Sequence, residues 1–341
     1  MLHLVCVTTA SAFLAVGPGA LVAAGDDGPT RSALPDRPTR TILRPTEISD
    51  AAPARASDKT VIVLVSGIGS DGSDSTFDPL IAALAGDAGY EIHRFGGDPA
   101  YPYDTRGSLD ENADRLTGEI RELAKTHPKI DIVAHSMGGA VVDDAFRRGL
   151  SATDKVVTYV ALASPHDGST EAKIMLPVLQ VGALAGASTE VRAITAGLAQ
   201  DIGTVAVRDL AAVRAVPPPH GVARLDVRMA TDAIVTAPDA WTPGVDSRTL
   251  LPSTIGAIEG HGGVTTDPHA IALVTSTLAM GRAPALDWRG AALEFAARTV
   301  SALIDQHAPV LYGAIGVGLL CCAVALSIYR RRRGRPFLVF P

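Results

Sequence analysis

Two kinds of hydrophobic pattern alternate through the middle of the chain. Unbroken apolar runs such as TVIVLVSG (60–67) and KIDIVAHS (129–136) are typical of strands that are buried on both faces. Runs of the same kind predict further strands at 90–96, 155–165 and 222–231. The pattern therefore predicts five strands, of which the one at 90–96 is the weakest.

Helical periodicity fills the segments between these strands. It predicts helices at 76–89, 108–128, 137–149 and 267–281. The second of them begins with Ser108 and Glu111 at capping-box spacing and carries its apolar residues on one face. Strands that alternate with helices predict an α/β fold, with a mostly parallel sheet and helices on both faces.

The segment 168–221 interrupts this alternation. It is alanine-rich, has helical spacing and ends in the breaker PPP at 217–219. It is far longer than an ordinary connection between elements. We therefore expect a helical cap insertion within a domain that spans 58–305, although its apolar residues could instead complete the core.

The two ends of the chain have a different composition. Residues 1–25 have no charged side chain and indicate a secretory signal peptide, with an uncleaved anchor helix as the alternative. Residues 26–57 are rich in Pro, Ala, Ser and charge, which is typical of a flexible linker. Residues 309–329 are uncharged and long enough to span a bilayer, and the arginine-rich tail 330–341 follows. These features predict a single-pass cell-membrane protein with an extracytoplasmic body and a cytoplasmic C-terminus.

Charge and cysteine content exclude some functions for the body. The net charge is -6, and five arginines stand near the C-terminus, so the body is more acidic still and offers no electrostatic footprint for nucleic acid. The three cysteines, Cys6, Cys321 and Cys322, lie in the apolar end segments, which leaves the body without a disulfide or thiolate metal site. No His, Asp and Glu cluster has metal-ligand spacing, and no cofactor is expected.

The stretch IDIVAHSMGGA (130–140) contains the strongest chemical signal. It predicts a buried strand that turns sharply into a helix, with Ser136 at the turn and the small residues Ala134 and Gly138 on either side. A serine there could cap the helix, or it could be a nucleophile of the G-x-S-x-G type, with alanine in place of the first glycine. The local pattern leaves both interpretations open.

Five motifs occur together and in a recognisable order. SGIGS, AHSMGG, LASPHDGS, TDAIV and GHGGVTTDP span roughly residues 60 to 280 and resemble the α/β-hydrolase superfamily, in particular its small bacterial lipase and esterase branch. That branch usually has histidine where this chain has Ser66. The resemblance implies a catalytic serine, an acid and a histidine in that chain order, with oxyanion N–H groups from the backbones of Ile68 and Met137.

The resemblance also selects the partners of Ser136. Asp232 follows the strand at 222–231 and matches the acid, with Asp239 as the stronger competitor and Asp226 as a charge expected at a sheet edge. His261, between glycines, matches the base. The other histidines have lesser expected roles: His269 on the surface, His166 in structural support, and His135 packed at the turn.

We expect a membrane-tethered serine hydrolase that cleaves carboxylic or lipid esters through an acyl-enzyme. An acyltransferase with the same three residues is one alternative. A catalytically silent hydrolase fold that serves as a surface binding module is another. The sequence contains every member of the expected triad, which argues against the silent fold.

Overall fold

The structure is a computed structural model, and it describes residues 57–70, 72–180, 192, 196, 200, 203–253, 260–307 and 310. These residues belong to one compact unit, Ala56–Pro341. The predicted signal peptide, the tail and nearly all of the linker lie outside the described residues.

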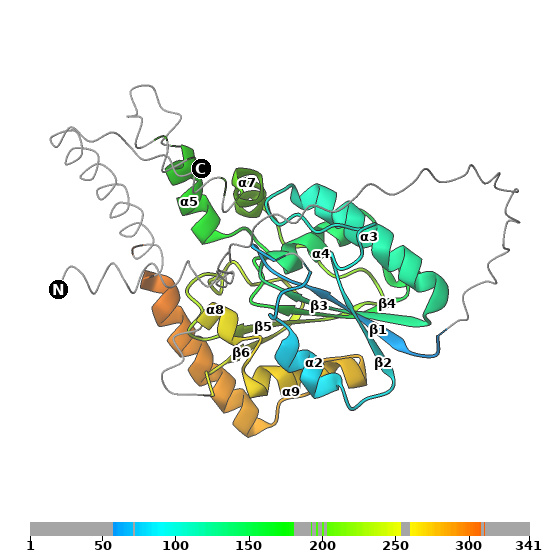
Figure 1. The fold of residues 1–341 in the computed structure, drawn as a ribbon. Coiled ribbons are helices and arrows are strands. Elements are labelled where there is room, and N and C mark those ends of the chain that lie inside the picture. The colour runs from blue at the N-terminus through cyan, green and yellow to red at the C-terminus, as the bar shows by residue number, and fades with distance from the viewer. Residues whose placement is uncertain are drawn as a thin grey trace, which may run out of the picture. The chain divides into compact units, whose positions relative to one another are not determined.

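A parallel sheet of six strands in the order β2-β1-β3-β4-β5-β6 runs through the unit (Figure 1). The strands are β1 (Thr60–Val65), β2 (Tyr90–Arg94), β3 (Lys129–His135), β4 (Val156–Leu162), β5 (Ala223–Met229) and β6 (Asp246–Leu250). The first five were predicted. The sixth, DSRTL, was missed because it is a short, polar edge strand in which only Thr249 is buried.

Helices connect the strands, as the alternating pattern predicts. They are α2 (Asp78–Leu84), α3 (Leu109–Thr126), α4 (Met137–Arg147), the 3₁₀ turn η1 (Ala152–Asp154), α5 (Thr170–Gln180), α7 (Thr204–Ala212), α8 (Gly260–Gly263) and α9 (Pro268–Met280). Residues 288–307 are also helical, and this helix was not predicted. Ser108 caps α3 by accepting a hydrogen bond from Asp110 N–H.

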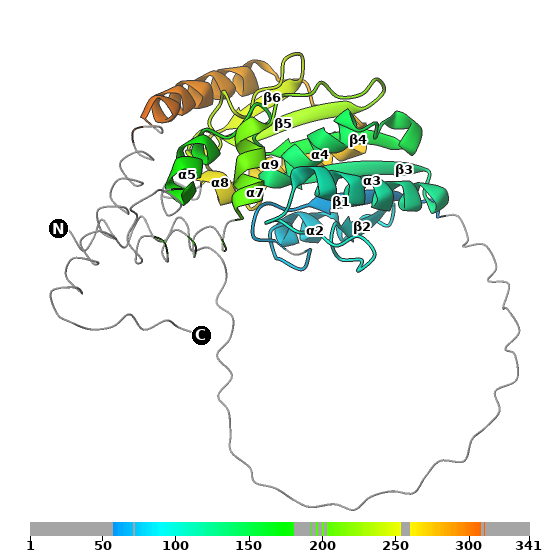
Figure 2. The same cartoon turned by 90° about the horizontal axis from the view of Figure 1, so that it is seen from above.

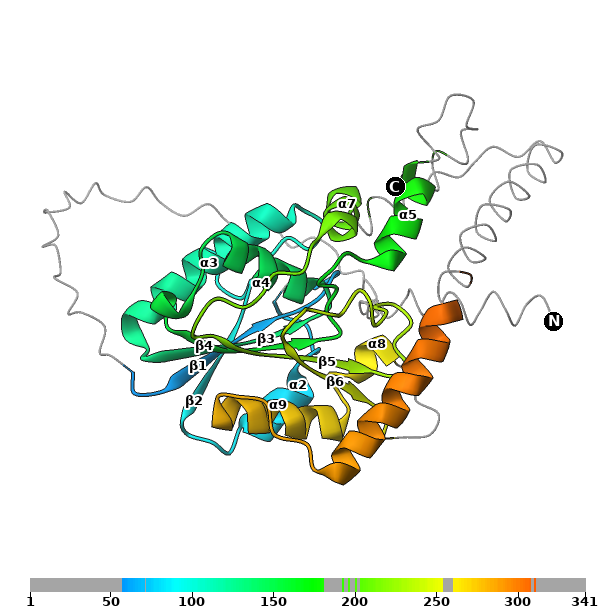
Figure 3. The same ribbon diagram turned by 180° about the vertical axis from the view of Figure 1, so that it is seen from behind.

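Alternate residues of each central strand enter two different cores. In β1, Val63 belongs to one apolar cluster and Leu64 to the other, and both side chains are buried. The first cluster lies under α3 and α4, and the second lies under α2 and α9 (Figure 3). Burial on both faces explains the unbroken apolar runs of the strands, and the prediction of helices on both faces is correct.

The described part of the segment 168–221 adds to the first of these cores. Helices α5 and α7 pack on each other, and Met175, Val207 and Leu210 belong to the cluster under α3 and α4. A role of this insertion as a cap over the active site stays a prediction.

The prediction of a membrane-spanning helix requires correction. Within the described part of the chain, no helix is long and apolar enough to cross a bilayer. The predicted span 309–329 lies, except for Val310, outside the described residues. The helix at 288–307 that precedes it carries Arg289, Glu294 and Arg298, and such charges are costly inside a bilayer. The predicted transmembrane helix is therefore contradicted, and the single-pass cell-membrane location that rested on it is withdrawn.

Candidate active site

Ser136 stands alone between a strand and a helix. It follows the last residue of β3 and precedes the first residue of α4, with φ 54° and ψ -129°. A positive φ is strained for a residue with a side chain, and such strain concentrates at functional turns. Although Ser136 is the N-cap residue of α4, its hydroxyl makes no capping hydrogen bond. The capping alternative therefore does not account for this side chain.

Two glycines allow the turn to be this tight. A Cβ added to Gly138 would lie 2.2 Å from the carbonyl oxygen of Val65, and one added to Gly67 would lie 2.8 Å from Cβ of Ser136. Real Cβ atoms do not approach so closely. The end of β1 thus presses against both the helix and the serine, as the small residues in the motif indicated.

The structure brings Ser136, His261 and Asp232 into one chain of contacts. Ser136 Oγ is 2.8 Å from Nε2 of His261, and Nδ1 of the same ring is 3.1 Å from Oδ2 of Asp232. A carboxylate only accepts, so the Nδ1 proton of His261 must donate to Asp232. Nε2 is then free to accept the hydroxyl proton of Ser136.

Electrostatics in the site favour a charged Asp232. Burial by itself would raise the pKa of Asp232, but His261 and the N–H group of Val235 outweigh burial and lower it. Burial by itself would lower the pKa of His261, but Asp232 and the charge of Glu171 raise it. Each member of the pair thus stabilises the charge of the other.

Glu171, in the first turn of α5, is a carboxylate near this pair that the sequence analysis did not consider. Burial, together with the negative charge of Asp232, raises its pKa to about 7 against an opposing effect of His261. Its ionisation therefore falls in the same pH range as that of a histidine.

The two other carboxylates considered from the sequence have different partners. Asp239 accepts hydrogen bonds from Thr170 and Thr236. Asp226 is buried in β5, an internal strand, where it pairs with Arg224. The expectation that Asp226 lies at a sheet edge is therefore wrong.

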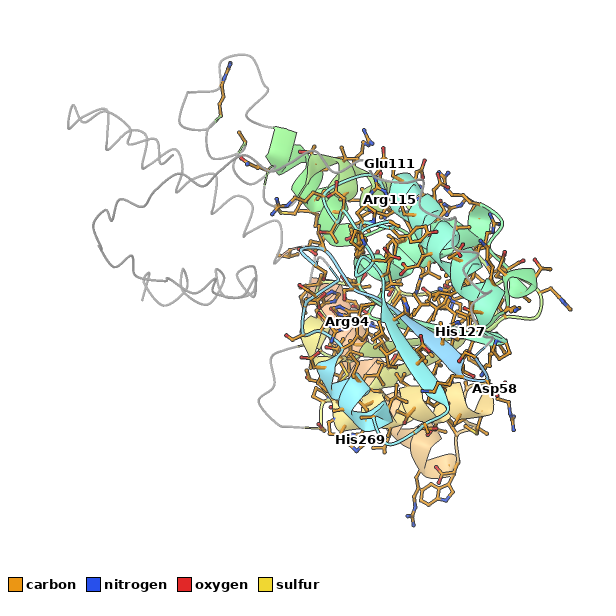
Figure 4. All side chains as sticks on the ribbon, turned by 45° about the vertical axis from the view of Figure 1, so that its right-hand side comes forward. Asp58, Arg94, Glu111, Arg115, His127 and His269 are labelled. Carbon is orange, nitrogen blue, oxygen red and sulfur yellow. The ribbon has the colours of Figure 1, made fainter. Side chains whose placement is uncertain are left out.

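Two of the remaining histidines lie away from the serine. His269 is exposed at the start of α9, on the outer side of the molecule (Figure 4). His166 is fully buried and its Nδ1 is 2.6 Å from Asp143, in the same ionic network as Arg224.

His135 has a more definite position than the sequence predicted. Its Nε2 is 3.2 Å from the backbone carbonyl of His261, and the two rings lie 5.0 Å apart. Burial, with the nearby His261, lowers the pKa of His135 to about 3, so the ring is neutral. A nitrogen that faces a carbonyl must carry the proton, so His135 donates to the backbone of His261. The residue before the serine is thereby tied to the loop of the histidine.

The loop after β1 lies beside the serine, where the resemblance placed Ile68. The Tyr103 hydroxyl donates to the carbonyl of Ser66 at 2.8 Å, and Gly69 N–H donates to Thr105 Oγ1 at 3.0 Å. These bonds brace the backbone on both sides of Ile68. No sequence signal pointed to Tyr103 or Thr105, because they lie 37 and 36 residues from Ser66 and Gly69 and only the fold brings them together.

Comparison with known proteins is consistent with this arrangement. A family model described as the PGAP1-like alpha/beta domain matches residues 108–176, which contain Ser136. A search of curated proteins gave no match.

Solved structures of low sequence identity also align with the chain. A lipase-esterase related protein from Clostridium acetobutylicum is 13% identical, with 66% of this chain and 96% of that chain covered and a TM-score of 0.44. A Bacillus licheniformis lipase in its mature form is 15% identical, with 68% and 96% covered and a TM-score of 0.42. Aspergillus fumigatus lipase B is 18% identical, with 76% and 62% covered and a TM-score of 0.45.

The parallel sheet and the strained serine at the end of β3 give the described part of the chain an α/β-hydrolase-like fold, and residues 108–176 match the PGAP1-like alpha/beta domain.

Proposed function

We propose that this protein is a serine hydrolase that cleaves carboxylic esters through an acyl-enzyme. The observation that carries the proposal is the pair of contacts from Ser136 to His261 and from His261 to Asp232. A hydroxyl, an imidazole and a buried carboxylate in this order are the groups that serine acyl transfer requires.

Each residue has a role that follows from its position. His261 Nε2 accepts the proton as Ser136 Oγ attacks the ester carbonyl, and it then protonates the departing alcohol. A water molecule, deprotonated by the same nitrogen, releases the acid from the serine. Asp232 holds the ring in the required tautomer and stabilises its positive charge.

The oxyanion of the tetrahedral intermediate needs N–H donors close to Ser136 Oγ. We assign this role to the backbones of Met137, the first residue of α4, and Ile68. The contact distance at Gly67 supports the choice of Ile68, because it places this loop directly against Ser136. The bond from Gly69 to Thr105 leaves Ile68 rather than Gly69 as the donor on this loop.

The direct test uses purified full-length protein, a panel of p-nitrophenyl esters from acetate to octanoate, and a fluorophosphonate probe. We expect turnover of at least one ester and labelling of Ser136, with neither in Ser136→Ala. A folded protein that neither labels nor turns over any ester would contradict the proposal and favour a silent binding module. Faster product formation with added alcohol, together with a transesterified product, would identify an acyltransferase instead.

A further inference from the structure

Asp232 lies in a part of the chain without regular structure. It follows the end of β5 by three residues, and the backbone from Thr231 to Val245 contains neither helix nor strand. Its carboxylate is held locally, because Oδ1 accepts from the N–H groups of Ile234 and Val235. Those bonds shape the turn itself but do not fix its position relative to His261.

Besides the backbone bond from Asp232 N–H to the carbonyl of Met229, a buried arginine ties this turn to the sheet through its side chain. Arg228, in β5, donates from Nη2 to the backbone carbonyl of Asp232 at 2.9 Å. Its side chain is 6% exposed. The carbonyl belongs to the same residue that holds His261, so a displacement of Arg228 would displace the carboxylate as well.

The helix at 288–307 holds Arg228 from the other side. Ser301 Oγ accepts from Nη1 at 2.5 Å, and Asp305 lies 3.4 Å from the same nitrogen. Asp305 also accepts from the N–H of Ala237, further along the turn of Asp232, at 3.2 Å. The helix lies along the β6 side of the sheet (Figure 2), beyond the last helix predicted from the sequence.

The turn packs closely against Gly260 on the side of His261, but not on the side of Arg228. A cavity of about 200 Å³ borders Arg228, Ser301 and Asp305, and neither Ser136 nor His261 lines it. Side chains beside a cavity lack packing partners on that side. The hydrogen bonds of Arg228 therefore restrain the turn on the side that borders the cavity.

We propose that Arg228, held by Ser301 and Asp305, is a positioning residue that keeps the turn of Asp232 in place for His261. This inference rests on the proposed function, since it concerns the residues assigned to catalysis. It gives the helix at 288–307 a role in the active site although none of its residues touches the triad.

The chain offers a matched control for this arginine. Arg248, on the adjacent β6, is 13% exposed, donates to the backbone carbonyls of Ser247 and Pro284, and faces Glu294 of the same helix. It borders the same cavity as Arg228, but its hydrogen bonds and ion pair go to residues outside the turn that holds Asp232. A purely structural role of such arginines would make both substitutions equally harmful.

The experiment compares Arg228→Gln, Asp305→Asn and Arg248→Gln in the full-length protein by steady-state kinetics on a soluble ester. We expect Arg228→Gln to lower kcat by about 10- to 100-fold, with KM changed by less than about threefold, since a misplaced catalytic group costs rate rather than ground-state binding. Asp305→Asn should lower kcat by about three- to tenfold, and Arg248→Gln by less than about twofold. Equal losses in Arg228→Gln and Arg248→Gln would overturn the proposal.

A second measurement does not depend on turnover. The proton between His261 Nδ1 and Asp232 should give a downfield proton NMR signal, which we expect to be lost or shifted in Arg228→Gln and unchanged in Arg248→Gln. An unchanged signal in Arg228→Gln would overturn the positioning role. Absence of turnover and labelling in the wild type would instead contradict the proposed function. If Arg228→Gln does not fold, Asp305→Asn provides the test in its place. Full kcat together with an unshifted proton NMR signal in Asp305→Asn would overturn the proposal.

Discussion

Ser136 and Asp232 lie beyond the carboxyl ends of two strands of one sheet, but the chain holds them in different ways. Ser136 sits between β3 and an 11-residue helix, so regular backbone hydrogen bonds and close glycine contacts fix its turn. Asp232 lies in irregular backbone, and side chains from β5 and from the helix at 288–307 hold it. A turn built into regular elements depends on adjacent residues, whereas an irregular turn depends on residues far away in the sequence.

The largest effect should come from the serine itself. Ser136→Ala should lower kcat by about four or more orders of magnitude, because the nucleophile has no substitute, and should leave the melting temperature nearly unchanged. His261→Ala should be comparably damaging, whereas His269→Ala should retain activity because this side chain is 73% exposed. Steady-state kinetics and thermal unfolding provide the measurements. Full activity in either Ser136→Ala or His261→Ala would refute the assignment.

Glycine substitutions test whether both turns depend on close backbone approach. A Cβ at Gly138 would lie 2.2 Å from the carbonyl of Val65, and one at Gly260 would lie 2.2 Å from that of Thr231. We expect Gly138→Ala to destabilise the fold by about 2 kcal/mol or more, since overpacking against backbone cannot be relieved by a rotamer change. Gly260→Ala should lower kcat by about tenfold or more, because it displaces His261 from Asp232.

The control for Gly260 lies in the same loop. A Cβ at Gly262 would meet nothing within 4 Å, so Gly262→Ala should leave kcat and the melting temperature nearly unchanged. Chemical denaturation and kinetics of the three variants provide the comparison. Equal kcat and equal melting temperatures in Gly260→Ala and Gly262→Ala would show that the close backbone approach at Gly260 does not matter for the histidine loop.

The sequence predicts these two regions unequally well, for the same physical reason. The turn of Ser136 was predicted in detail because β3, the small residues and α4 are contiguous and each has a local signal. Asp232 and His261 were chosen only through a family resemblance, and Asp239 remained a competitor until its partners were known. Arg228 and Asp305 gave no signal, because 77 residues separate them and only the fold brings them together.

The rest of the fold shows the same difference between elements with a local sequence signal and elements without one. Four buried strands and the half-buried β2 could be predicted from their hydrophobic patterns, whereas β6 and the helix at 288–307 could not. The strand is polar, and the mixture of apolar and charged positions in the segment 288–307 did not lead to the prediction of a helix. The prediction of a membrane span rested on composition alone, and no helix among the described residues is long and apolar enough to cross a bilayer.

A smaller effect should come from His135, which joins the two turns. Replacing it with leucine removes the N–H group that donates to the carbonyl of His261, and we expect kcat to fall by about three- to 30-fold with little change in KM. His135→Gln, which can present an amide N–H to the same carbonyl, should recover part of this loss. Identical kinetics of the two variants would indicate that packing rather than the hydrogen bond matters.

The smallest effect should be a pH effect of Glu171, the carboxylate near the base. His261 acts as a base only when neutral, so the acid limb of kcat/KM should follow its pKa, which the charge of Glu171 helps to raise. Glu171→Gln removes that charge, so the acid limb should move to lower pH, while the plateau changes by less than about twofold. The displacement should be small, because burial raises the pKa of Glu171 itself to about 7 and the group is largely protonated on the acid side of the profile. Profiles of kcat/KM against pH for the wild type, Glu171→Gln and Glu122→Gln, an exposed carboxylate on α3, provide the measurement. A shift to higher pH, or an equal shift in both variants, would mean that the charge of Glu171 does not act on His261.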